Sequence, residues 1–198
     1  MTRPLRVVGL NGSYGHPSKT ASLVDAIIAE QGRRMPIESR RFDVAFLGAG
    51  LSTALDRAEV DAQAEEALRA VEGADLVIAA SPVYRGSYSG LFKHFVDLLD
   101  QYALADTPVI LAATGGSERH QLMLDHELRP LFAFLQAHIS PCGVYASDGD
   151  FAGGELLNPQ VQARIELAVR DLRPLLQSRL MDDARIAAER QVVSDPVR

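Results

Sequence analysis

Apolar and polar residues are grouped in blocks along the chain, and these blocks predict strands and helices in alternation. Apolar runs predict strands over residues 5–10, 75–80, 107–113 and 139–145. The run 37–44 alternates with charged residues, which is typical of a strand at the edge of a sheet. Apolar positions at helical spacing predict helices over residues 18–33, 56–72, 90–102, 117–138 and 159–180.

This order of elements predicts an α/β fold with a doubly wound parallel sheet and helices on both faces. We expect one domain over residues 1–180 and a polar, partly loose tail over 181–198. Ligands of such sheets bind beyond the carboxyl ends of the strands, where the strand order reverses. Three strand ends carry small and hydroxyl residues, so the predicted site consists of a first loop (11–20), a second loop (81–89) and a third loop (114–117).

The first loop is suited to a phosphate monoester. It leads into a helix, and the N–H groups and positive dipole end of a helix N-terminus attract anions. Glycines spaced by three do not match the dinucleotide fingerprint, and the end of the loop only resembles a Walker loop. Candidate phosphate donors are Ser13, Ser18, Lys19, Thr20 and Ser22. The alternative is that Ser18 merely caps the helix, which is compatible with phosphate binding.

The second and third loops predict room for a flat ring. Pro82 to Tyr84 place a rigid turn and an aromatic side chain after a buried strand, although an ordinary strand-to-helix connection is the alternative. In the third loop, Gly115 and Gly116 allow the backbone to approach a ligand closely, because neither has a side chain. With a phosphate at the first loop, the three loops predict a site for a planar heterocycle that carries a phosphate.

Three stretches of these loops give the chain a family resemblance over about residues 5–178. It resembles the NAD(P)H-dependent FMN reductases of flavodoxin-like fold, and especially the branch paired with two-component alkanesulfonate and methanesulfonate monooxygenases. The stretches are Gly12-Ser13 with Ser18-Lys19-Thr20-x-Ser22-Leu23, Ser81-Pro82-Val83-Tyr84-x-x-Ser87-Tyr88-Ser89-Gly90-Leu91-x-Lys93, and Ala113-Thr114-Gly115-Gly116. The resemblance implies a five-stranded parallel sheet in the order 2-1-3-4-5.

The resemblance also implies a role for each loop. The first loop would hold the FMN phosphate through Ser13, Ser18, Lys19, Thr20 and Ser22. The second loop would border the flavin through Pro82, Val83, Tyr84 and Ser87, and the third would border the isoalloxazine edge through Thr114, Gly115, Gly116 and Ser117. Hydride transfer from a nicotinamide to flavin N5 requires stacking and proximity, so no catalytic acid or base is assigned.

The expected function is an NAD(P)H:FMN oxidoreductase that supplies reduced flavin to a flavin-dependent monooxygenase in sulfonate metabolism. One alternative is a quinone, azo or metal-oxyanion reductase with bound FMN. Another is a flavodoxin-type electron carrier, against which the lack of tryptophan and the modest net charge of −6 both count. Loops of glycine and serine cover a ring face poorly, which favours exchangeable FMN. The sequence leaves NADH and NADPH undecided.

Composition and charge argue against several other classes of protein. A net charge of −6 without a Lys/Arg block argues against nucleic-acid binding, and no apolar run reaches the length of a membrane span. The single cysteine, Cys142, excludes an internal disulfide, fits a reducing compartment and is expected in the core, in the last strand. No signal-peptide pattern is visible, so a cytoplasmic protein is expected. The five histidines lack metal-ligand spacing, so no metal site is expected.

The predicted helix 117–138 contains an irregularity at Pro130, which cannot donate a hydrogen bond to the carbonyl of His126. Four leucines here keep helical phase, whereas two apolar residues before them do not: Leu124, Leu128, Leu131 and Leu135 against Leu122 and Met123. A one-residue bulge near Asp125 and His126, which gives a wide turn over residues 125–128, would reconcile the two, and a simple proline kink is the alternative. The resembled branch includes members with an inserted residue here, at a subunit contact. The resemblance thus implies a wide turn near His126 that faces another subunit of a homodimer or homotetramer.

Overall fold

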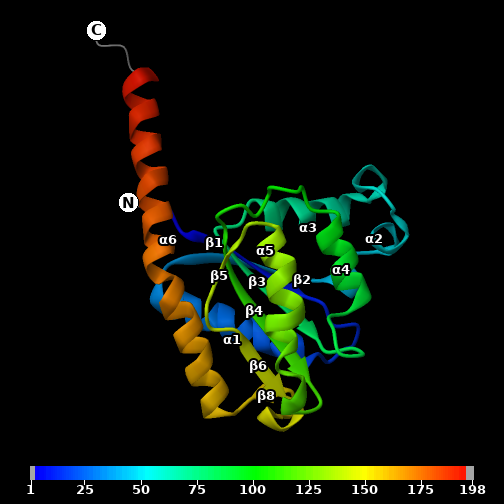
Figure 1. Cartoon of the computed structure of the whole chain (residues 1–198). Helices are drawn as coiled ribbons and strands as arrows, with labels where there is room; N and C mark the ends of the chain where they lie inside the picture. Colours follow the sequence, from blue (N-terminus) through cyan, green and yellow to red (C-terminus); the bar gives the residue numbers. More distant parts are fainter. Residues whose placement is uncertain (1–2, 195–198) are drawn as a thin grey trace.

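The computed structural model describes residues 3–194, with side chains up to Asp182, and its centre is a parallel β-sheet (Figure 1). The strands run in the order β2-β1-β3-β4-β5, and β6 also pairs with β4. Their bounds are β1 Leu5–Asn11, β2 Ile37–Asp43, β3 Leu76–Pro82, β4 Pro108–Gly115, β5 His138–Ile139 and β6 Val144–Ser147. The predicted fold class, the strand order and the edge position of β2 are therefore confirmed. A small antiparallel pair, β7 Phe151–Ala152 and β8 Glu155–Leu156, follows.

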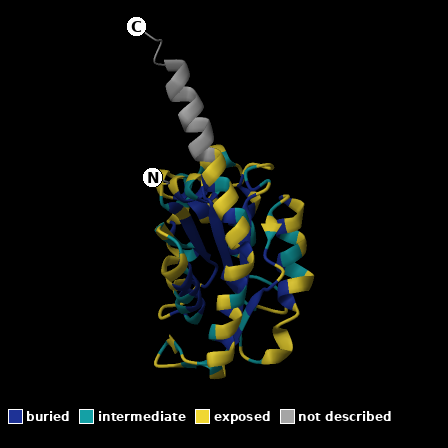
Figure 2. Cartoon of the chain, turned by 90° about the vertical axis from the view of Figure 1, so that its left-hand side faces the viewer, coloured by how far each residue is buried: buried dark blue, intermediate teal, exposed yellow. Residues whose placement is uncertain are grey.

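Helices cover both faces of the sheet, and the side chains of the strands are buried between them (Figure 2). Helices α1 (Lys19–Arg34) and α6 (Pro159–Ser194) pack on one face, and α3 (Ala62–Glu72), α4 (Gly90–Asp97) and α5 (Arg129–Phe134) pack on the other. Alternate residues of each strand point to opposite faces, which explains why nearly the whole of β3 and β4 is apolar. No helix within residues 3–194 is long and apolar enough to cross a membrane.

Several predicted boundaries were wrong. The stretch 45–56 links the predicted strand 37–44 to the predicted helix 56–72, and no helix was expected in it, but it contains the short helix α2 (Ala49–Thr53). Helix α3 begins at Ala62, not near residue 56, because the Asp61 side chain accepts a hydrogen bond from Ala64 N at 2.9 Å and caps the helix there. Helix α4 ends at Asp97, before the predicted residue 102.

The last predicted strand, 139–145, is also corrected, because it is interrupted between β5 and β6. Pro141 lies in the gap and has no N–H to donate to a neighbouring strand. The Arg129 side chain donates to the carbonyls of Ser140 and Pro141, at 3.2 and 3.4 Å, so these carbonyls have a partner outside the sheet.

The wide turn predicted over residues 125–128 is confirmed as a π-helix, Leu124–Leu128. The amide of Arg129 donates to the carbonyl of Leu124, five residues earlier. The predicted helix 117–138 is accordingly divided into a 3₁₀ turn at Glu118–His120, the π-helix, and α5. We call the π-helix, residues 124–128, the π-turn below.

Helix α6 extends beyond its predicted end at residue 180 and projects past the sheet (Figure 1). Pro174 lies inside it without ending it. The missing N–H of Pro174 would face the carbonyl of Arg170, an exposed residue where water can donate instead. The expected boundary between domain and tail at residue 180 falls within this helix, and residues 195–198 of the tail lie outside the described residues.

Cys142 is buried as expected, although it lies in the gap between β5 and β6 rather than in a strand. Burial raises the pKa of its thiol, and nearby charges have smaller effects in both directions. We therefore expect Cys142 to react with a thiol reagent at pH 8 at least about tenfold more slowly than it does in the denatured chain. Labelling with a chromogenic disulfide along a urea titration tests this. Equal rates in native and denatured protein would contradict the burial of the thiol.

Candidate functional site

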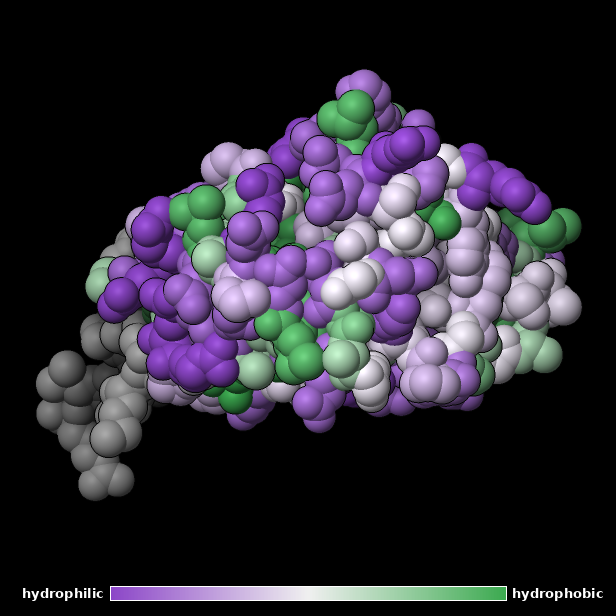
Figure 3. Space-filling view, turned by 90° about the horizontal axis from the view of Figure 1, so that it is seen from below, coloured by the Kyte–Doolittle hydropathy of each residue, from purple (hydrophilic) through white to green (hydrophobic). Residues whose placement is uncertain are grey.

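The carboxyl ends of β1, β3 and β4 bring the three predicted loops together. Gly12 N donates to the carbonyl of Ala80 at 2.8 Å, which joins the first loop to the end of β3. Val83 N donates to the carbonyl of Thr114 at 2.7 Å, which joins the second loop to the third. Figure 3 views this face of the molecule, where hydrophilic and weakly polar residues surround separate hydrophobic patches.

The first loop ends in a capped helix start, as the sequence suggested. The side chain of Ser18 accepts a hydrogen bond from Ala21 N at 3.1 Å, and its own O–H proton is left to donate. The amides of Lys19 and Thr20, in the first turn of α1, have no intrahelical acceptor. Ser13 is buried, and its hydroxyl accepts from Gly15 N at 3.4 Å, so it also keeps a proton to donate. The helix start thus gathers several donors.

A pair of threonines joins the first loop to the third. Thr20 Oγ1 and Thr114 Oγ1 lie 2.6 Å apart, and both side chains are buried. One proton lies between the two oxygens, so the second hydroxyl proton is available to a ligand. Ser22 differs, because its hydroxyl donates to the Ser18 carbonyl at 3.3 Å and supports the helix.

Lys19 is engaged by a residue that the sequence analysis did not single out. Its Nζ lies 2.7 Å from Asp148 Oδ1, and both side chains are substantially exposed. The ion pair ties the helix start to the turn that follows β6. Since the two residues lie far apart in sequence, only the fold reveals the pairing.

The second loop forms a tight hairpin. Tyr84 and Ser87 exchange two backbone hydrogen bonds, of 2.8 and 3.1 Å, around Arg85 and Gly86. Both central residues have positive φ, 53° and 84°, a conformation that glycine adopts without strain. The Tyr84 ring packs against Tyr14 of the first loop, with centroids 5.3 Å apart. Tyr14 was missed by the sequence analysis, although an aromatic residue in a loop of small residues was a usable signal.

Other serines of the second loop have structural roles. Ser89 caps α4 and donates to the Gly12 carbonyl at 2.6 Å, while its own amide donates to Ser81 Oγ at 3.0 Å. The side chains of Ser81 and Ser89 are fully buried. They hold the first and second loops together at the end of the sheet. The Ser87 side chain instead donates to Glu127 Oε2 at 2.8 Å.

The third loop is fixed by Tyr145, another residue that the sequence analysis missed. The Tyr145 hydroxyl donates to the Ser117 carbonyl at 2.6 Å. Burial, and then the negative charges of Asp148 and Asp150, raise the pKa of this phenol and keep it protonated. A Cβ atom on Gly115 would lie only 2.3 Å from the Tyr145 hydroxyl, so a glycine is needed there, whereas Gly116 is open.

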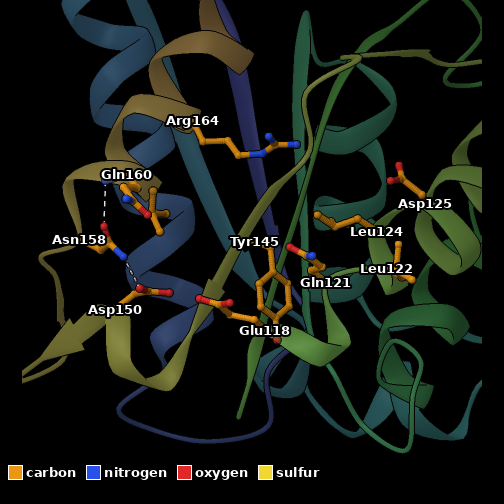
Figure 4. Close-up of a pocket in the computed structure, with 11 residues that line it drawn as sticks. Glu118, Gln121, Leu122, Leu124, Asp125, Tyr145, Asp150, Asn158, Gln160 and Arg164 are labelled. Atoms are coloured by element: carbon orange, nitrogen blue, oxygen red, sulfur yellow. Dashed lines mark hydrogen bonds between the residues drawn. The ribbon is translucent and has the colours of Figure 1, made fainter.

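A cavity of about 380 Å³ lies beside the third loop, between the π-turn region, β6 and the start of α6 (Figure 4). None of the thirteen predicted site residues lines it. Its wall carries the carboxylates Glu118, Asp125 and Asp150 against the single guanidinium of Arg164. This charge balance disfavours a phosphate, so the cavity and the loops differ in chemistry.

The donors of the first loop fit the phosphate of FMN. Protons from Ser13, Ser18 and the Thr20–Thr114 pair remain unused among the described residues, beside two helical amides. The neighbouring loops leave space for a planar ring. In the described part of the chain, a Cβ atom on Gly116 in the third loop would meet nothing within 4 Å apart from its chain neighbours, and Tyr84 in the second loop is exposed.

Similar sequences are found among FMN reductases. The family model described as NADPH-dependent FMN reductase matches residues 5–152. The chain is 50% identical over 187 residues to the NADH-dependent FMN reductase SfnF of Pseudomonas fluorescens, covering 94% of this chain and 100% of that protein. It is 49% identical over 179 residues to an FMN reductase (NADPH) of Pseudomonas aeruginosa, covering 90% and 96%.

Solved structures agree as well. An oxidoreductase from Corynebacterium diphtheriae superimposes with a TM-score of 0.79 at 33% identity, over 89% of this chain and 99% of that one. The apo form of an NADH:FMN oxidoreductase, EMOB, gives a TM-score of 0.75 at 31% identity, over 84% and 87%. The chain therefore belongs to the NADPH-dependent FMN reductase family.

Proposed function

We propose that this protein is an NAD(P)H-dependent FMN reductase that transfers hydride from a nicotinamide to FMN and releases reduced flavin to a monooxygenase. The observation that carries the proposal is the set of unused donors at the start of α1, which matches a phosphate monoester. Family membership supports the reaction, since FMN supplies the N5 atom that accepts hydride. The chain's own task is to hold the two rings together in the geometry for hydride transfer.

The binding residues follow from the three loops. The phosphate is held by the first loop, with Ser13, Ser18, Thr20 and the α1 amides as donors, and with Lys19 and Ser22 supporting the helix start. The flavin ring lies between the second and third loops. The residues that border it are Pro82, Val83, Tyr84, Ser87, Thr114, Gly115, Gly116 and Ser117.

We further propose that the enzyme acts in the cytoplasm and supplies reduced flavin to a sulfonate-degrading, flavin-dependent monooxygenase. It assembles as a homodimer or homotetramer, with the π-turn near His126 at a subunit contact. Relatives named as NADH-dependent and as NADPH-dependent are almost equally similar, so both nucleotides belong in the assay.

NAD(P)H oxidation with FMN titrated from zero tests the function. A rate that saturates in added FMN, together with loss of flavin on gel filtration in both redox states, is the expected result. FMN that co-purifies stoichiometrically, with a rate that depends only on an added quinone, would support the quinone-reductase alternative. No oxidation of either nucleotide would support an electron carrier and contradict the proposal.

A further inference from the structure

Glu127 connects the π-turn to the second loop. Its Oε2 accepts a hydrogen bond from Ser87 Oγ at 2.8 Å, between residues 40 apart in the sequence. This contact directly joins a side chain of the π-turn to a side chain of the loop expected to border the flavin. Two unrelated elements are therefore joined through one carboxylate.

The position of Glu127 makes a carboxylate unusual. Leu124 and Leu128, on either side of it in the π-turn, are both buried in the core beneath the sheet face. Glu127 itself is half-buried, next to the buried Leu128. Partial burial of a carboxylate is costly unless it accepts hydrogen bonds, and Ser87 supplies one. Packing therefore gives no reason for the carboxylate at this position, and its hydrogen bond does.

The bond reaches the aromatic pair through the hairpin. Ser87 is held to Tyr84 by two backbone hydrogen bonds, so fixing Ser87 also fixes the Tyr84 backbone. The Tyr84 ring in turn packs on Tyr14, whose hydroxyl accepts from Leu91 N at 2.9 Å. A change at Glu127 would consequently alter the position of the Tyr84–Tyr14 pair, which joins the first and second loops.

We propose that Glu127 is a positioning residue for the flavin, acting through Ser87 to hold the 84–87 hairpin in its binding geometry. The inference rests on the proposed function, because the hairpin matters to the reaction only where FMN binds against it. Glu127 is not expected to touch the reacting atoms. Its loss should therefore weaken FMN binding and leave the hydride-transfer step largely unchanged.

Two substitutions of similar size test this. Glu127→Leu fills the same space without an acceptor, and Glu127→Gln keeps an amide oxygen that can accept from Ser87. We expect Glu127→Leu and Ser87→Ala each to raise the KM and the Kd for FMN about tenfold, the effect of losing one hydrogen bond to a charged group. For Glu127→Leu, the kcat at saturating FMN should stay within about twofold of wild type. For Glu127→Gln, the KM for FMN should stay within about threefold of wild type.

The double variant Ser87→Ala with Glu127→Leu should lose no more FMN affinity than Ser87→Ala alone, since the bond that Glu127→Leu removes is already absent there. Asp125→Ala is the matched control, because it removes another carboxylate from the same π-turn and should leave the KM for FMN unchanged. The Asp125 side chain pairs with Arg129 and lines the cavity instead of contacting the second loop (Figure 4). A wild-type KM in Glu127→Leu, or additive losses in the double variant, would overturn the inference. If wild-type protein shows no dependence on FMN, the proposed function fails instead.

Discussion

Replacing Ser18 with aspartate should weaken FMN binding at least about a hundredfold while the protein stays folded. Aspartate caps a helix as well as serine does, and its charge is favourable at the helix N-terminus. The same carboxylate would lie where the phosphate is expected to bind, beside the amides of Lys19 and Thr20. Two like charges about 4 Å apart repel by about 4 kcal/mol at the dielectric of a protein surface, which exceeds a hundredfold in affinity.

Riboflavin supplies the control, because it carries the same ring without a phosphate. We expect the Ser18→Asp variant to bind and reduce riboflavin like wild type, and its Tm to be unchanged or higher. Fluorescence titration with both flavins and a thermal melt measure these quantities. Equal FMN affinities in the variant and wild type would show that Ser18 only caps α1, and equal losses for both flavins would place the phosphate elsewhere.

The parts of the fold that could be predicted from the sequence are those decided by local pattern. β3 and β4 are buried on both faces, so their sequences are almost entirely apolar and identify them as central strands. The polar β2 was assigned to the edge for the converse reason. The phase conflict around Pro130 indicated the π-turn, because two apolar stripes separated by one residue need an inserted position.

The parts that could not be predicted depend on contacts between distant residues. Pro141 was a local signal for the interruption of the last strand, but the bonds from Arg129 to the carbonyls of Ser140 and Pro141 were not encoded by any local pattern. The pairing of Lys19 with Asp148 likewise exists only in the folded chain. The three loops themselves were predictable as a group, since parallel strands place their carboxyl ends at one edge, but their internal hydrogen bonds were not.

A second large effect, on the stability of the fold, is expected from replacing Asp75, which precedes β3 at the opposite end of the sheet. Its side chain is only 4% exposed and accepts from Arg3 Nη2 at 2.9 Å and from Arg6 N at 2.8 Å. Burial alone would raise the pKa of this carboxyl, but the hydrogen bonds from Arg3 and Arg6 outweigh it and lower the pKa to about 2. The ionised form is therefore favoured in the folded state, and Asp75→Asn should cost about 2 kcal/mol at pH 7.

The pH dependence distinguishes this charge effect from a packing defect. A folded-state pKa below the unfolded value contributes stability above pH 4, and that contribution disappears as the pH falls through about 2. At pH 7 the Tm of Asp75→Asn should lie about 4–8 °C below wild type, and the gap should narrow between pH 4 and pH 2. Asp106→Asn is the matched control, since that side chain is 87% exposed and should leave the Tm unchanged. A gap that persists undiminished at pH 2 would mean that the asparagine disturbs packing, because at that pH most of the stability contributed by the lowered pKa of Asp75 is lost.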